Sequence, residues 1–127
     1  MVGSESYGEV CQSLFEFRDA RDWQQFHTPR NLILAMTGEL GELASLFQWV
    51  PDVEIGAWAQ EPANRQRLTE EIGDVYAYLI LFAAAVDINP VVALKEKMMQ
   101  NAEKYPIAKS HGNSQKYVEF HGPSTAS

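Results

Sequence analysis

Residues 37–49 read TGELGELASLFQW, and this stretch decides the fold that we expect. Its leucines recur every three residues, which favours a helix with one apolar side. Two glycines interrupt the run, although each glycine inside a helix costs about 1 kcal/mol relative to alanine. Two glutamates interrupt it as well, and a buried carboxylate costs more unless something compensates its charge. A helix that carries both penalties side by side indicates a functional site.

The rest of the chain predicts three further long helices around this one. We expect the first within residues 4–22, the second over 29–49, the third over about 63–87, and the fourth from residue 90 to just before Pro106. The second and fourth begin with strong signals, Thr28-Pro29 and Asn89-Pro90, because a capping side chain followed by proline is typical of a helix start. Residues 50–64 form a connector, in which DVEIGAWA predicts a short helix.

These helices define the expected fold class. No segment alternates polar and apolar residues in the manner of a strand, so we expect an all-α, four-helix-bundle-like domain over residues 1–106. Residues 107–127 are polar and rich in glycine and serine, which predicts an irregular C-terminal tail. The second and third helices carry more apolar surface than one thin layer of helices covers, which favours an oligomer over a self-contained bundle.

Composition excludes several classes of function. The net charge of −7 makes the chain a poor binder of nucleic-acid polymers, which need clustered lysine and arginine. The longest apolar run, residues 75–86, is shorter than the roughly 20 residues of a membrane span. We see no signal peptide in MVGSESYGEV, and the single cysteine, Cys11, excludes an intramolecular disulfide. We therefore expect a cytoplasmic protein that binds no membrane.

Four acidic residues form the strongest chemical signal. Glu39 and Glu42 lie three apart on the second helix, and Glu71 and Asp74 lie three apart on the third, in the matching patterns E-L-G-E and E-I-G-D. Residues three apart share a helix face, so the two pairs can converge between neighbouring helices. Four carboxylates stay ionised together only with a counter-ion, and all-oxygen ligation suits Mg²⁺ or Mn²⁺ rather than zinc.

Two other interpretations of these acids compete with a metal site. The first is a set of structural salt bridges, which is the usual fate of buried charge. The second is a di-iron bundle, which requires glutamate followed three residues later by histidine, and neither acidic helix has that pattern. Glu70 adjoins Glu71 but is about 100° round the helix, so we expect it to face elsewhere.

With these residues in view, the sequence resembles the MazG-like all-α nucleoside triphosphate pyrophosphatases, and most of all their dCTP pyrophosphatase branch. The four acids match the family pattern E-x-x-E, spacer, E-x-x-D. Four longer segments look like that branch and lie in the expected order: WQQFHTPRN at 23–31, GELGELASLFQW at 38–49, EEIGDVYAYL at 70–79 and KMMQNAEKYP at 97–106.

The resemblance implies a reaction and a set of site residues. It implies Mg²⁺-dependent hydrolysis of a nucleoside triphosphate, dCTP or a modified dCTP, to the monophosphate and pyrophosphate. Glu39, Glu42, Glu71 and Asp74 would be the metal ligands and catalytic residues. The implied substrate-binding residues are Trp23, His27 and Trp49 near the base, Tyr78 near the sugar or phosphate, Asn101 near the base or sugar, and Lys104 near phosphate. Each of these six also has a plainer interpretation, in packing, helix capping or a solvated helix end.

The resemblance further implies a homo-oligomer, a tetramer built as a dimer of dimers. The substrate stays open between dCTP, dUTP, an oxidised purine and other nucleotides, and a non-catalytic nucleotide- or metal-binding oligomer is the alternative from another class. We expect Gly38 and Gly41 to let a neighbouring backbone approach closely, so that Glu71 and Asp74 reach the same ion. We also expect Trp49 to close the helix that carries Glu39 and Glu42, so that one element holds both phosphate and base.

Overall fold

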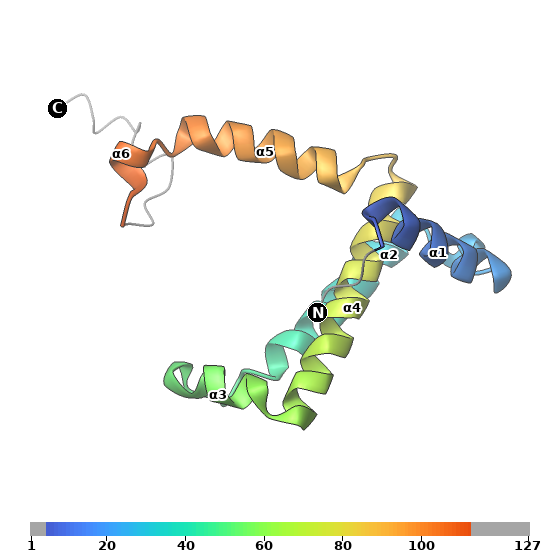
Figure 1. Cartoon of the computed structure of the whole chain (residues 1–127). Helices are drawn as coiled ribbons and strands as arrows, with labels where there is room; N and C mark the ends of the chain where they lie inside the picture. The colour runs from blue at the N-terminus through green and yellow to red at the C-terminus, as the bar shows by residue number, and fades with distance from the viewer. Residues whose placement is uncertain (1–4, 113–127) are drawn as a thin grey trace. The chain divides into compact units, whose positions relative to one another are not determined.

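The computed structural model describes residues 5–112, and within that range it contains helices and turns but no strand. The all-α prediction is therefore confirmed for the described chain. Figure 1 labels the elements, which follow in the order α1 (Tyr7–Ala20), η1 (Gln24–Phe26), α2 (Pro29–Ser45), η2 (Asp52–Glu54), α3 (Ile55–Gln60), α4 (Pro62–Ala85), α5 (Pro90–Lys104) and α6 (Ile107–Ser110). The chain divides into two compact units, one ending at Ile88 and one beginning at Asn89.

The helix starts read from the sequence are confirmed. The Thr28 hydroxyl accepts a hydrogen bond from the Asn31 backbone N–H at 3.1 Å, which satisfies one of the free donors at the start of α2. The Asn89 side chain does the same for α5, with the backbone N–H of Val91 at 2.9 Å. In both helices the proline that follows the cap lacks an N–H, so it adds no unsatisfied donor.

The second helix is shorter than predicted. α2 ends at Ser45, and residues 46–49 form turns rather than helix. The backbone N–H of Phe47 reaches back only three residues, to the Ala44 carbonyl oxygen at 3.1 Å. Pro51 lies just beyond, and proline disfavours helical backbone in the residue before it. The prediction that Trp49 closes the acidic helix is therefore wrong.

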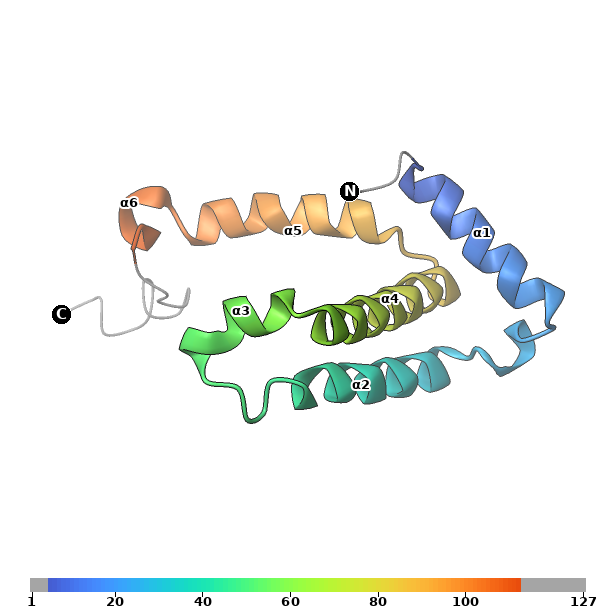
Figure 2. The same cartoon turned by 60° about the horizontal axis from the view of Figure 1, so that its bottom comes forward.

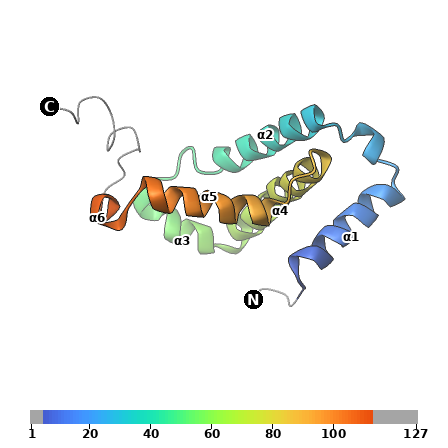
Figure 3. The same ribbon diagram turned by 90° about the horizontal axis from the view of Figure 1, so that it is seen from above.

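The first unit is built on a pair of packed helices, α2 and α4, which lie side by side and run in opposite directions (Figures 2 and 3). α1 and α3 also contact α4. Among the described residues of this unit, the buried apolar side chains come from α1, α2, the turn after α2 and α4 itself: Cys11, Leu32, Leu46, Ile80, Leu81 and Ala83. The helix pair therefore provides the frame on which the acidic side chains are placed.

The glycines of α2 do not have the role that we predicted. A Cβ atom added at Gly38 or Gly41 would meet nothing within 4 Å, and both residues are exposed. Successive residues on a helix are about 100° apart, so the glycine positions point away from α4 when the adjacent glutamates face it. The prediction that they admit a neighbouring backbone is wrong within the described chain.

The second unit consists of α5 and a short α6. Tyr105 ends α5 with its backbone N–H on the Asn101 carbonyl oxygen at 2.8 Å, and Pro106 follows. Residues 107–110 are helical where an irregular tail was expected, because the N–H groups of Lys109 and Ser110 bond the Pro106 carbonyl oxygen. The rest of the expected tail, residues 113–127, lies outside the described residues.

The length and composition of the described helices bear on whether one of them could cross a membrane. Within residues 5–112 no single helix is long and apolar enough to cross a membrane, although α4 and α5 counted together reach that length and composition.

Candidate active site

Three carboxylates meet between the paired helices. Glu39 and Glu42 from α2 and Glu71 from α4 each offer one oxygen, and these three oxygens lie within 4.8 Å of one another. They meet because residues three apart share a face of α2 and that face packs against α4. Oxygens on opposite sides of one Mg²⁺ lie about 4.2 Å apart, so the spacing is close to what a single ion requires.

The electrostatics of this group indicate that a cation belongs there. One carboxylate oxygen of Glu39 and one of Glu71, Oε2 in each case, is buried without a hydrogen-bond partner. Burial, followed by the charges of Glu42, Asp74 and Glu71, raises the pKa of Glu39 from 4.5 to about 7. Buried polar atoms are normally satisfied, so two carboxylate oxygens without partners in this group fit ligands of a metal ion.

A structural salt-bridge role for these acids finds no support in the described chain. Within residues 5–112 the ion pair present is Arg18 with Asp19, and neither residue belongs to the acidic group. Glu70 faces away from the group as expected, since its carboxylate accepts a hydrogen bond from the Gln66 amide at 2.8 Å. Among the described residues, therefore, none provides a counter-charge for the Glu39, Glu42 and Glu71 carboxylates.

The fourth predicted acid lies beside the group rather than in it. Asp74 on α4 lines the same cavity as Glu39, and its charge contributes to the raised pKa of Glu39. Its carboxylate is outside the set of oxygens that lie within 4.8 Å of one another. Asp74 is thus close enough to act on Glu39 electrostatically.

A cavity of about 200 Å³ adjoins the acids and collects three of the predicted substrate-binding residues. Glu39 and Asp74 form part of its wall, and Trp23, His27 and Tyr78 line it as well. Nδ1 of His27 is buried without a hydrogen-bond partner. Burial, and then the nearby charge of Arg18, lowers the pKa of His27, so this imidazole is neutral at neutral pH. The wall of this cavity therefore contains carboxylates, the Trp23 ring and an imidazole nitrogen without a hydrogen-bond partner.

The other three predicted residues lie elsewhere. Trp49 is 85% exposed and lines a separate cavity with Pro51 and Trp58. Asn101 and Lys104 belong to α5, in the second unit. Their roles in substrate binding stay predictions.

Sequence reasoning missed two residues of α1, Phe17 and Arg18, which line the cavity next to Trp23. Phe17 and Trp23 pack edge to face, with ring centroids 5.7 Å apart. A signal was present in the sequence, because Leu14 and Arg18 are four apart and share a helix face. An arginine on the apolar face of a helix normally has a specific partner, and that would have marked it.

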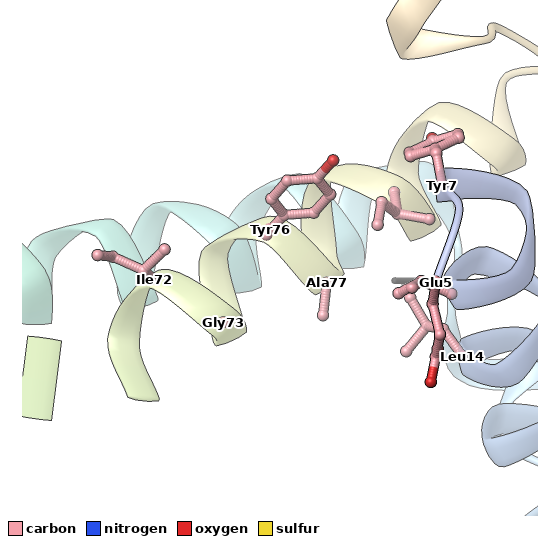
Figure 4. Close-up of a pocket in the computed structure, with 9 residues that line it drawn as sticks. Glu5, Tyr7, Leu14, Ile72, Gly73, Tyr76 and Ala77 are labelled. Carbon is pink, nitrogen blue, oxygen red and sulfur yellow. The ribbon is translucent and has the colours of Figure 1, made fainter. Parts of the chain in front are cut away.

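A larger cavity of about 530 Å³ lies between α1 and α4, and none of the four predicted acids lines it (Figure 4). Leu14 from α1 and Ile72 and Ala77 from α4 contribute to its apolar wall. Burial, and then the Cys11 side chain, raises the pKa of Tyr7 to about 12, so this phenol stays neutral. Glu39 and Asp74 line the smaller cavity, and neither of them lines this larger one.

The fold and site define an all-helical protein with acidic pairs on two packed helices, and comparisons with known proteins agree with that class. The model of the MazG-like family matches residues 35–120, and the chain belongs to that family. It is 47% identical to dCTP pyrophosphatase 1 of Rattus norvegicus over 105 residues, which cover 83% of this chain and 62% of that protein. It is 46% identical to dCTP pyrophosphatase 1 of Homo sapiens over 108 residues, which cover 84% of this chain and 64% of that protein.

A solved structure shares the fold. A pyrophosphatase from Archaeoglobus fulgidus superposes with a TM-score of 0.74 at 35% identity, covering 84% of this chain and 99% of its own. The chain spans less than two thirds of the length of the dCTP pyrophosphatases it matches.

Proposed function

We propose that this protein is a Mg²⁺-dependent nucleotide pyrophosphohydrolase that converts dCTP, or a modified dCTP, to the monophosphate and pyrophosphate. The observation that carries the proposal is the group of three carboxylates, two with orphaned buried oxygens, beside a cavity lined by Trp23 and His27. The relatives named dCTP pyrophosphatase 1 support the choice of dCTP. Removal of faulty or excess nucleotides from the cellular pool is the corresponding role.

The residues of the site would have different roles, which follow from where each of them lies. Glu39, Glu42 and Glu71, with Asp74 beside them, would hold Mg²⁺. When bound, the ion offsets the repulsion between these acids and a triphosphate, and it lowers the pKa of a bound water. Trp23 offers a flat face for a base. The neutral His27 ring, whose Nδ1 is unused, offers a hydrogen-bonding partner at the same end of the cavity.

The test is a nucleotide panel with product identification. The protein is incubated with Mg²⁺ and, separately, dCTP, 5-methyl-dCTP, dUTP, dTTP, dATP and dGTP, and the products are resolved by anion-exchange chromatography. We expect dCMP and pyrophosphate from dCTP, with no turnover in EDTA. Release of inorganic phosphate and dCDP would contradict the proposed bond cleavage. Faster turnover of dUTP or a purine would move the activity to another substrate, and binding without turnover would favour a non-catalytic role.

We also propose that the active form is a homo-oligomer, most simply a tetramer built as a dimer of dimers. Large apolar side chains on α2 and α4 are exposed in the single chain, among them Leu34 at 63%, Leu40 at 53% and Ile72 at 55%. Few apolar side chains are buried among the described residues of the first unit, and extensive exposed apolar surface is typical of protein interfaces. A second copy would cover the surface that the chain leaves open.

A further inference from the structure

Arg18 is held in the wall of the substrate cavity by contacts that leave part of its guanidinium unused. Its side chain is 15% exposed, and Nε donates to Oδ1 of Asp19 at 2.8 Å. The guanidinium carbon also lies 5.0 Å from the centroid of the Phe15 ring. A guanidinium has five N–H donors, and within residues 5–112 no hydrogen bond uses those of Nη1 and Nη2. An arginine that is mostly covered, oriented and only partly bonded has donors left for a ligand.

Two cavities meet at this side chain. The first, of about 200 Å³, contains Glu39 and Asp74 in its wall, and the second, of about 240 Å³, extends from Arg18 and His27 toward Gln24. Both are lined by Arg18, His27 and Leu81. Among the described residues that line either cavity, Arg18 is the only lysine or arginine. A ligand whose charged end lies at the acids would extend its other end toward Arg18.

The surroundings of Arg18 suit a base better than a phosphate. Phe17 and Trp23 line the first cavity together with Arg18, and their rings pack edge to face. The phosphates would lie near Glu39, Glu42 and Glu71, which would hold the ion, because a bound cation offsets the repulsion between phosphates and acids. The covered position of Arg18 also strengthens its hydrogen bonds, because water competes less for the donors.

We propose that Arg18 is a specificity-determining residue that reads the nucleobase, donating from Nη1 and Nη2 to two adjacent acceptors such as N3 and O2 of cytosine. The inference rests on the proposed nucleotide pyrophosphohydrolase function and adds the group that selects the base. The planar fork of an arginine matches two neighbouring acceptors, which a lysine ammonium cannot do. Uracil and thymine carry a hydrogen on N3, so they present a donor where Arg18 needs an acceptor, and the site disfavours them.

The test compares Arg18→Met with the wild-type protein on three substrates: dCTP, dUTP and 3-deaza-dCTP, in which a C–H replaces the N3 acceptor. Good bidentate contacts discriminate between bases by about ten- to a hundredfold. We expect the wild type to prefer dCTP over both other nucleotides by a factor of that size in kcat/KM. Arg18→Met should lose most of this preference, chiefly because kcat/KM for dCTP falls. Arg18→Lys keeps the charge and should not restore the preference.

Arg67→Met is the matched control, because Arg67 is exposed on α4 and lines none of the cavities described above. It should leave all three kcat/KM values unchanged. An active wild type with an unchanged preference in Arg18→Met would overturn the inference, and so would an equal loss on all three substrates, which indicates a phosphate or structural role. Melting curves show whether each variant folds. If Arg18→Met does not fold, the substrate preference of Arg18→Lys tests the inference instead. A wild type that hydrolyses no nucleotide contradicts the proposed function instead.

Discussion

At the scale of single residues, the proposed chemistry depends on acids that have no counter-charge within residues 5–112. Glu39, Glu42 and Glu71 come together because helical spacing and the pairing of α2 with α4 place them there. Nearby carboxylates raise one another's pKa unless a cation is present, as the pKa of Glu39 shows. Whether an acid can bind the metal ion therefore depends on where its own side chain lies, and an acid adjacent to it in the sequence need not bind the ion.

Glu71 and Glu70 provide a matched pair for testing this point. We expect Glu71→Gln to lower kcat/KM by more than about a hundredfold, because it removes a ligand whose metal stabilises the transition state by several kcal/mol. It should also weaken Mn²⁺ binding, measured by titration calorimetry without nucleotide. Glu70→Gln makes the same chemical change one residue away, on a side chain that bonds Gln66, and should change neither quantity. Equal effects of the two substitutions would remove Glu71 from the metal site.

The raised pKa of Glu39 predicts how the stability of the metal-free protein varies with pH. An acid whose pKa is higher in the folded state binds more protons there, so its contribution is complete below the ordinary value of 4.5 and is lost as pH rises through about 7. Each pKa unit corresponds to about 1.4 kcal/mol at most, and water at the site reduces this. His27, with a lowered pKa, acts in the opposite sense below its ordinary value of 6.5.

The test therefore compares the melting temperature of Glu39→Gln with that of the wild-type protein. In EDTA, the melting temperature of Glu39→Gln minus that of the wild type should be lower at pH 5 than at pH 8 and should rise between them. Saturating Mg²⁺ should raise the wild-type melting temperature at pH 8, since ligands stabilise the state that binds them. A difference that does not vary with pH would show that Glu39 titrates normally.

At the scale of elements, α2 is positioned by its ends and by one face. Thr28 begins the helix, the turns before Pro51 end it, and the acidic face meets α4. Its glycines contribute nothing to that contact within the described chain. They remain as a local weakness in the helix.

That weakness is testable by substitution. Gly41→Ala should raise the melting temperature by a few degrees, because alanine favours a helix interior by about 1 kcal/mol and the added Cβ meets open space. Gly38→Ala should behave alike, whereas Gly112→Ala should give no gain, since Gly112 has a positive φ of 79°. Thermal melts of the three variants provide the comparison. A loss of stability in Gly41→Ala would show that this position faces a packed surface.

At the scale of the whole molecule, many large apolar side chains are exposed, whereas few are buried in the core of the described chain. Ile72 and Tyr76 of α4 are 55% and 51% exposed, and they lie on the wall of the large cavity between α1 and α4. A chain with so little covered surface has few buried contacts to offset the entropy of folding. Association with a second copy is the simplest source of the missing burial.

Light scattering tests this association directly. A 14.3 kDa chain should elute with about four times that mass at micromolar concentration if it is a tetramer. Ile72→Glu should shift the protein toward smaller species, because it places a charge in the proposed contact. Val53→Glu is the comparison, since Val53 is 95% exposed on the short η2 turn rather than on a long helix face. A wild type that elutes only as a monomer would refute the oligomer.

The sequence by itself determined the helices, their capped starts and which acids share a face, because all of these depend on neighbours within about four residues. Only the tertiary structure decided the rest. It placed Asp74 beside the group of three acids, turned Gly41 toward open space and put Arg18 of α1 in the wall of the same cavity as His27 and Glu39. These features depend on how distant segments pack, and helical spacing alone does not specify which faces of two helices meet.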